Sequence, residues 1–304
     1  MAEQHVIKKR EHGKVMAALS SVIAAVLLTV MKIVVGILTG SLGILAEAAH
    51  SGLDLVAAIM TLFAVKISDR PADKEHLYGH GKVENLSALF ETLLLFGTCV
   101  WIIYEAIQRL FFKAVEVEVN IWAFIVMGIS IIVDISRSKV LYRAARKYKS
   151  QALEADALHF STDIWSSAVV ILGLIFVKLG TIFPKLILFE HADAIAAVAV
   201  AFIVVFVSIK LGIRTIQSLI DVAPKGIKER ITEEVEKIEG VMDCHNVRLR
   251  QSGPKLFIDI HIIVDGSKSL QEVHELTDNI EKRIEEKIPD SDITVHPEPD
   301  TAGN

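Results

Sequence analysis

The chain has 304 residues, of which 52% are hydrophobic, and its mean hydropathy is +0.47. A soluble domain is usually about half apolar or less, so the composition argues against a purely soluble protein. The two cysteines, Cys99 and Cys244, are too few for a disulfide framework or a cysteine-rich zinc ribbon.

Charge is unevenly distributed along the chain. Up to Ile220 there are 21 Lys and Arg residues against 18 Asp and Glu residues, a balance of +3. From Asp221 onward the counts are 11 and 19, a balance of −8. We therefore expect a polar N-terminal segment at 1–14, a membrane domain at 15–220 and an acidic domain at 221–304. The N-terminal segment lacks the apolar core of a signal peptide, so the first apolar run is expected to remain as an anchor.

Six apolar windows have about the 20 residues that a helix needs to cross a bilayer. They are Val15–Leu38, Ile44–Ile67, Leu86–Leu110, Ile121–Leu141, Leu158–Leu179 and Ala194–Ile213. The turn at Gly40 is short, whereas the loops at 111–120 and 180–193 are expected to be longer.

Basic residues indicate the orientation of these windows. Lys and Arg concentrate before the first window, between the second and third, and between the fourth and fifth, while the opposite loops hold few. Loops rich in Lys and Arg stay in the cytoplasm. We therefore expect both termini on the cytoplasmic side, which agrees with an even number of spans.

The second and fifth windows share a short pattern, a histidine followed four residues later by an aspartate. The pairs are His50 with Asp54 and His159 with Asp163. Residues four apart lie on one face of a helix, so each pair presents an imidazole beside a carboxylate. Ionisable groups at membrane depth are costly, and two nitrogens with two oxygens suit Zn²⁺. We interpret these residues as a metal site; the alternative is polar hydrogen bonding between helices.

Other charged residues lie in or beside the windows. Glu47 and Asp156 each precede a histidine of the repeat by three residues. Either could orient a ligand from an outer shell or pair with another helix. Lys32, Glu91, Glu105 and Asp134 are expected to pair between helices or face a water-filled cavity, and we assign them no transport role.

A second cluster of candidate ligands lies in the loop after the second window. It consists of Asp73, His76 and His80, beside glycines at 79 and 81 that let the chain curl. The three side chains could surround one cation. The same residue types are also common in solvated loops.

The C-terminal region predicts a small α+β domain. Apolar residues recur at helical spacing from Ile227 to Ile238, and a turn at 251–254 separates two strand-like runs. Ser269 and Glu272 form a capping box that begins a second helix. A last strand is expected at Ile293–His296.

This domain carries four of the eleven histidines of the chain. His245 and His261 could meet across the hairpin, and His296, with Glu298 nearby, could join from the last strand. The alternative is ordinary solvated histidine. For His274, which lies on the predicted helix, both interpretations fit the spacing.

The sequence contains no H-E-x-x-H, G-x-S-x-G or Walker pattern, so we expect no enzymatic activity. A catalytic metal site keeps an open position, whereas four convergent ligands close the coordination shell and favour carriage. A membrane-embedded metalloenzyme and a membrane metal sensor are the alternatives from other classes.

Taken together, these patterns resemble the cation diffusion facilitator family of proton-coupled metal transporters. The resemblance covers almost the whole chain, including Leu45–Asp54, Arg70–Glu84, Ala155–Asp163 and Val247–Gly253. It implies a polytopic fold of six transmembrane helices followed by an α+β cytoplasmic domain shaped like a metallochaperone. It also implies a homodimer formed through that domain.

The resemblance further implies functional residues at matching positions. The transport site carries over to His50, Asp54, His159 and Asp163. A loop site carries over to Asp73, His76 and His80. A cytoplasmic site carries over to His245, His261, His274, His296 and Glu298, the last of which is an aspartate in the family. A charge link is implied between Lys82 and Asp221.

The expected function is export of Zn²⁺ from the cytoplasm across the cell (inner) membrane, in exchange for protons and by alternating access. Efflux of Fe²⁺, Co²⁺ or Mn²⁺ by the same mechanism is the alternative. The expected partners are a second copy of the chain, divalent metal ions, protons and the lipid bilayer. Zn²⁺ is also expected as a regulatory ligand, without an organic cofactor and without nucleic acid.

Overall fold

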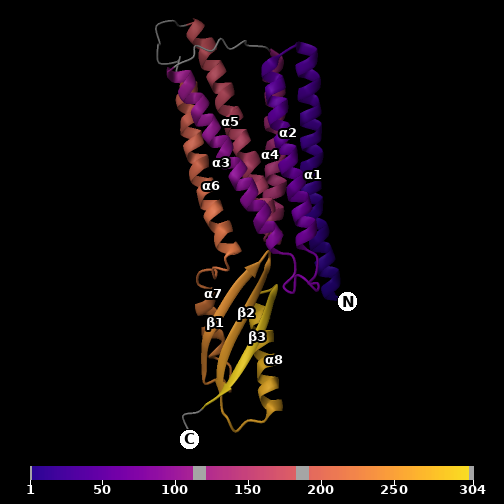
Figure 1. The fold of residues 1–304 in the computed structure, drawn as a ribbon, viewed down its shortest axis with the longest axis vertical. Helices are drawn as coiled ribbons and strands as arrows, with labels where there is room; N and C mark the ends of the chain where they lie inside the picture. The colour runs from indigo at the N-terminus through magenta and orange to yellow at the C-terminus, as the bar shows by residue number, and fades with distance from the viewer. Residues whose placement is uncertain (1, 112–120, 183–191, 301–304) are drawn as a thin grey trace. The chain divides into compact units, whose positions relative to one another are not determined.

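The structure is a computed structural model, and it describes residues 2–111, 121–182 and 192–300. Within these ranges the chain forms eight helices and three strands, which Figure 1 labels in chain order. The chain divides into two compact units: Met1–Arg70 with Val83–Thr215, and Pro71–Lys82 with Ile216–Asn304. The loop that carries the second candidate site therefore belongs to the same unit as the C-terminal domain.

The first unit is a bundle of long helices (Figure 1). They are α1 (Ala2–Thr39), α2 (Leu42–Ser68), α3 (Lys82–Phe111), α4 (Ile121–Tyr148), α5 (Gln151–Ile182) and α6 (Ala192–Leu219). Among the described residues, four stretches are long and apolar enough to cross a membrane: Glu11–Thr39, Ile44–Ser68, Lys82–Trp101 and Phe202–Leu219.

Several helices extend beyond the predicted windows. α1 already begins at Ala2, α4 continues to Tyr148, and α5 begins at Gln151 rather than Leu158. The windows follow apolar composition, whereas helical hydrogen bonding continues through polar turns at the membrane boundary. The predicted loops at 111–120 and 180–193 lie largely outside the described residues.

The outer surface of the bundle is apolar. Large side chains such as Leu27, Phe63, Ile132 and Phe206 are mostly exposed. A soluble protein rarely exposes so much contiguous apolar surface, and lipid is the solvent that suits it. Inside, α1, α4 and α5 meet around small residues, including Ala18, which let the backbones approach closely.

The C-terminal domain is a three-stranded sheet with two helices packed on it (Figure 1). Its elements are α7 (Ile227–Val235), β1 (Asp243–Ser252), β2 (Lys255–Val264), α8 (Leu270–Lys287) and β3 (Ser291–Pro299). β1 pairs antiparallel with β2, and β3 pairs parallel with β2. Alternate residues of the strands face the helices, so the polar residues between them lie on the opposite face.

Candidate metal sites

The four residues of the repeated pattern converge between α2 and α5. The Nε2 atom of His159 lies 3.0 Å from Asp54 Oδ1 and 3.7 Å from Asp163 Oδ2. The Nε2 atom of His50 lies 3.9 Å from Asp54 Oδ1 and 3.7 Å from Asp163 Oδ1. Two imidazoles and two carboxylates thus share one small volume, as the spacing predicts.

The four side chains differ in exposure. The side chain of His159 is 5% exposed and that of Asp54 is 11% exposed, whereas that of His50 is 39% exposed. The site is therefore buried around His159 and Asp54 and accessible beside His50. This asymmetry suits a site that an ion enters and leaves.

Other charged residues in the helices pair with neighbours. The Lys32 ammonium donates to Ser51 Oγ at 2.8 Å and lies 3.2 Å from Glu47 Oε2. Glu91, which is buried, accepts a hydrogen bond from the Thr61 hydroxyl. These contacts fit the predicted pairing between helices, and Glu47 faces Lys32.

Two buried cations were not singled out by sequence reasoning. Lys14 is fully buried, where its ammonium contacts Asp69 and lies 2.8 Å from Glu84 Oε1. Arg137 is also buried and lies 3.3 Å from Asp134 Oδ1. Lys14 directly precedes the first predicted window and Arg137 lies near the end of the fourth, and neither position in the sequence carries information on burial.

The loop residues Asp73, His76 and His80 also converge. His76 Nδ1 and His80 Nε2 each lie 3.3 Å from a different oxygen of Asp73. The backbone N–H groups of His76 and Glu75 donate to Asp73 and hold the pKa of its carboxyl below its usual range. The carboxylate is therefore ionised, as a metal ligand must be.

In the C-terminal domain, three histidines form a row across the sheet. The strand register places His261 opposite His245 on one side and His296 on the other. Glu298 Oε1 accepts a hydrogen bond from His261 Nδ1 at 2.7 Å, which lowers the pKa of the Glu298 carboxyl. Its other oxygen lies 3.6 Å from His245 Nε2. His245, His261 and Glu298 form a group that could hold one ion.

Two other polar residues of this domain lie outside that group. His274 is exposed on α8, where its Nδ1 atom lies 3.8 Å from Asp278 Oδ1. Cys244 faces the hydrophobic core, and burial raises the pKa of its thiol to about 11. A neutral, buried thiol is a poor metal ligand, because metals bind the thiolate.

The loop and the sheet of this unit are in direct contact. The guanidinium carbon of Arg250 lies 3.4 Å from the ring centroid of Tyr78, and the same ring meets Phe257 edge-on at 5.2 Å. Lys82 lies 2.9 Å from Asp221 Oδ1, as the resemblance implied for this pair. The loop is thereby anchored at Tyr78 and at Lys82.

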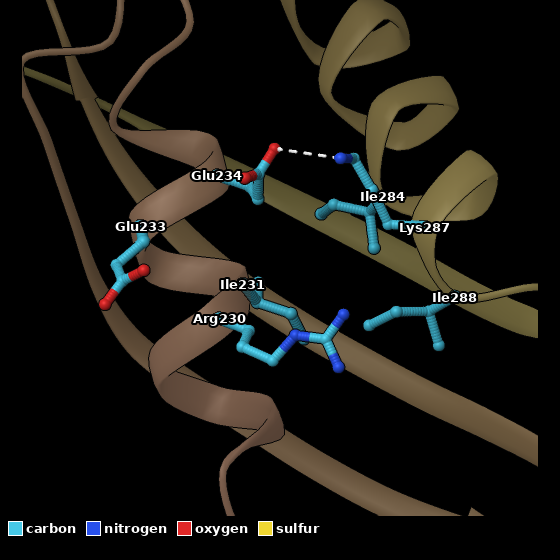
Figure 2. Close-up of a pocket in the computed structure, with 7 residues that line it drawn as sticks. All are labelled: Arg230, Ile231, Glu233, Glu234, Ile284, Lys287 and Ile288. Carbon is cyan, nitrogen blue, oxygen red and sulfur yellow. Dashed lines mark ion pairs between the residues drawn. The ribbon is translucent and has the colours of Figure 1, made fainter.

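A small cavity of about 140 Å³ lies between α7 and α8 (Figure 2). Arg230, Glu234 and Lys287 line it together with apolar side chains, and Glu234 lies 3.9 Å from Lys287. Figure 2 shows that these charges come from both helices. None of the residues that line the cavity is a histidine or cysteine.

The geometry defines a class of protein: a multi-pass membrane protein with metal-type ligands inside its helical bundle and on an extramembrane domain. Two family models match. Residues 18–220 match the "Cation efflux transmembrane domain", and residues 223–300 match the "Cation efflux protein, cytoplasmic domain".

Relatives match across the chain. Cation-efflux pump FieF of Yersinia enterocolitica is 31% identical over 93% of this chain and 92% of its own length. The protein of the same name from Serratia proteamaculans is 30% identical over the same shares. A solved structure of CzrB in a zinc form is 27% identical over 27% of this chain and 94% of its own, with a TM-score of 0.25.

The chain belongs to the cation efflux family, which is the cation diffusion facilitator family. The predicted family and fold class are thus confirmed, and the protein is a multi-pass membrane transporter of metal cations. The helical bundle is its transmembrane domain and the α+β unit its cytoplasmic domain.

Proposed function

We propose that this protein exports Zn²⁺ in exchange for protons, with His50, Asp54, His159 and Asp163 as the transport site. The observation that carries the proposal is the convergence of ligands from two helices, with His159 Nε2 at 3.0 Å from Asp54 Oδ1. When one ion is bound by residues of both α2 and α5, its affinity changes whenever one helix moves relative to the other. Such a link is what alternating access requires.

The chemistry of the ligands favours zinc. Imidazole suits Zn²⁺, Co²⁺, Ni²⁺ and Fe²⁺, whereas Mn²⁺ and Mg²⁺ prefer oxygen. Two nitrogens and two oxygens match the tetrahedral shell of Zn²⁺. Efflux of Fe²⁺, Co²⁺ or Mn²⁺ is the alternative, and it predicts that one of these metals is transported faster than Zn²⁺.

Proton exchange follows from the same ligands. A hydrogen bond between an imidazole nitrogen and a carboxylate oxygen, as between His159 and Asp54, contains one proton. Zn²⁺ binds neutral imidazole and ionised carboxylate, so an imidazolium at this site must release one proton to solvent before the ion binds. On the more acidic side of the membrane, protonation would release Zn²⁺. On the cytoplasmic side, loss of the protons would restore the site.

The direction of transport is proposed as outward through the cell (inner) membrane, with both termini in the cytoplasm. The clustering of Lys and Arg in alternate loops supports this orientation. The relatives, which are bacterial proteins named cation-efflux pumps, support export.

The loop and tail clusters are proposed as regulatory zinc sites of a homodimer. Asp73 with its two histidines would hold one ion, and Glu298 with His245 and His261 another. Zinc on the tail would draw two cytoplasmic domains together and favour transport. The Lys82–Asp221 pair would link the helices to the tail. Zinc-dependent dimerisation measured by light scattering tests the proposal, and loss of the effect in His261→Ala is expected.

Carriage fits the site better than catalysis. A catalytic zinc keeps one position open for water, and a general base stands nearby. Four protein ligands, as proposed for this site, would leave no such position. We therefore propose that the protein is a carrier without enzymatic activity.

Metal uptake into everted vesicles tests the proposed function. Vesicles with the unaltered protein should accumulate Zn²⁺ faster than Co²⁺, Fe²⁺ or Mn²⁺. Asp54→Asn and His159→Ala should abolish uptake, whereas His12→Ala, which alters an exposed histidine of α1, should not. A preference for another metal would overturn the zinc assignment. Normal zinc uptake by Asp54→Asn would overturn the transport site.

A further inference from the structure

Arg137 is a permanent cation buried in the middle of the helical bundle. It lies on α4, and its side chain is 5% exposed. An arginine at membrane depth is costly unless it has specific partners, so its contacts indicate why it is there. It belongs to none of the three candidate metal sites.

Its guanidinium holds three neighbours. Nη1 donates to Asp134 Oδ1 at 3.3 Å, and Nη2 donates to Ser21 Oγ at 3.1 Å. The guanidinium carbon lies 3.5 Å from the ring centroid of Phe160. The Ser21 hydroxyl in turn donates to Asp156 Oδ2 at 3.3 Å. Arg137 therefore interacts with two residues of α5. It stacks on the ring of Phe160, and its hydrogen bond to Ser21 connects it to Asp156.

The two residues of α5 lie on either side of a transport ligand. Asp156 precedes His159 by three positions, and Phe160 follows it directly. The Phe160 ring also meets the His159 ring edge-on, with centroids 5.5 Å apart. Arg137 thus contacts the ring that packs against this imidazole, and through Ser21 it reaches Asp156, three residues before it.

A neighbouring contact fixes the same segment. The hydroxyl of Ser138 on α4 donates to the carbonyl oxygen of Ala157 at 3.0 Å. From the other side, Asp54 on α2 meets His159 Nε2 at 3.0 Å. The segment 156–160 is therefore held by α4 and α1 while its histidine faces α2.

We propose that Arg137 is a positioning residue for the transport site, setting the place and angle of His159 through Phe160 and the Ser21–Asp156 hydrogen bond. This inference rests on the proposed function of the four ligands. Arginine suits the task because its planar guanidinium stacks on a ring while its fork of N–H groups donates sideways. Lysine keeps the charge but has neither the plane nor the fork.

The test compares Arg137→Lys with Phe160→Leu, which removes the ring but keeps an apolar side chain. Arg146→Lys is the matched control, because Arg146 also stacks on a ring of α4, that of Tyr142 at 4.6 Å, but is exposed. The readouts are the half-saturating zinc concentration and the maximal rate per folded molecule in proteoliposomes. Zinc bound by the cytoplasmic domain serves as an internal check of folding.

Arg137→Lys should raise the half-saturating zinc concentration by about ten-fold, the lower end of the effect of groups that orient metal ligands. Phe160→Leu should act in the same direction, and the double variant should add little, because both changes release the same histidine. Arg146→Lys should match the unaltered protein, and zinc bound by the cytoplasmic domain should not change.

Two results would overturn the inference in distinguishable ways. If Arg137→Lys and Phe160→Leu lowered only the yield of folded protein and left half-saturation unchanged, Arg137 would merely hold the helices together. If His159→Ala transported zinc normally, the proposed transport site itself would fail.

Discussion

A buried ionic cluster of the helical unit gives a quantitative prediction for Lys14. Its ammonium contacts the carboxylates of Asp69 and Glu84, and the Lys14 and Glu84 side chains are fully buried. Glu84 also accepts hydrogen bonds from the hydroxyl groups of Ser68 and Ser150. Lys14→Met would remove the cation that contacts both carboxylates.

Removing one partner of a buried ion pair costs about 3–5 kcal/mol, because the remaining charge stays buried without compensation. Glu84 retains its two hydroxyl donors after Lys14→Met. We therefore expect a loss near the lower limit, about 3 kcal/mol, in the free energy of unfolding. Adding Glu84→Gln removes the buried negative charge of Glu84. The double variant should therefore lose less free energy of unfolding than the two single variants lose in sum.

The assay is denaturant unfolding of the purified protein in detergent, followed by tryptophan fluorescence. Lys139→Met, which removes an exposed cation of α4, is the control and should change the free energy of unfolding by less than about 0.5 kcal/mol. If Lys14→Met were as stable as Lys139→Met, the ion pairs of Lys14 would not stabilise the folded protein.

The remaining predictions concern the loop and the cytoplasmic domain. In calorimetry of the full protein, His261→Ala should remove one zinc-binding event, while His274→Ala should not; equal effects would contradict the observed grouping. Backbone N–H groups stabilise the ionised form of Asp73 and lower its pKa in the folded protein. The stabilisation that this carboxylate gives the loop is therefore complete above the ordinary aspartate pKa of about 3.9. It is lost only as the pH falls through the lower pKa of the folded protein. An NMR titration of the Asp73 carboxyl should therefore give a pKa below 3.9, and a higher value would refute the loop geometry. Cys244 should resist maleimide at neutral pH, since its thiol is buried with a pKa of about 11, and react once the domain is unfolded; rapid labelling of the folded protein would contradict the packing.

Periodicity was sufficient to predict which residues share a face in the proposed transport site. A step of four residues on a helix fixes which face His50 and Asp54 share, so their pairing needed no knowledge of other helices. Alternation along β2 likewise placed His261 on the exposed face of the sheet. The register that puts His296 beside His261 depends on the pairing of strands that are distant in sequence. The sequence alone predicted only that His296 could join the cluster from the last strand.

Buried cations were the part that sequence reasoning missed. Arg137 and Lys14 lie at the ends of apolar windows, where positive charge normally marks the cytoplasmic boundary. Their burial depends on partners from other helices: Glu84 of α3 for Lys14, and Ser21 of α1 and Phe160 of α5 for Arg137. Such partners are distant in sequence, so a linear pattern cannot distinguish a buried arginine from a boundary arginine.

Simultaneous measurement of zinc and pH in proteoliposomes tests the central claim most directly. With a zinc dye inside and an inward-directed zinc gradient, the unaltered protein should move Zn²⁺ in and protons out, and an imposed proton gradient alone should drive zinc against its own gradient. Asp54→Asn should abolish both fluxes together. Zinc movement that ignores the proton gradient would contradict the exchange, and coupled fluxes that persist in Asp54→Asn would contradict the site.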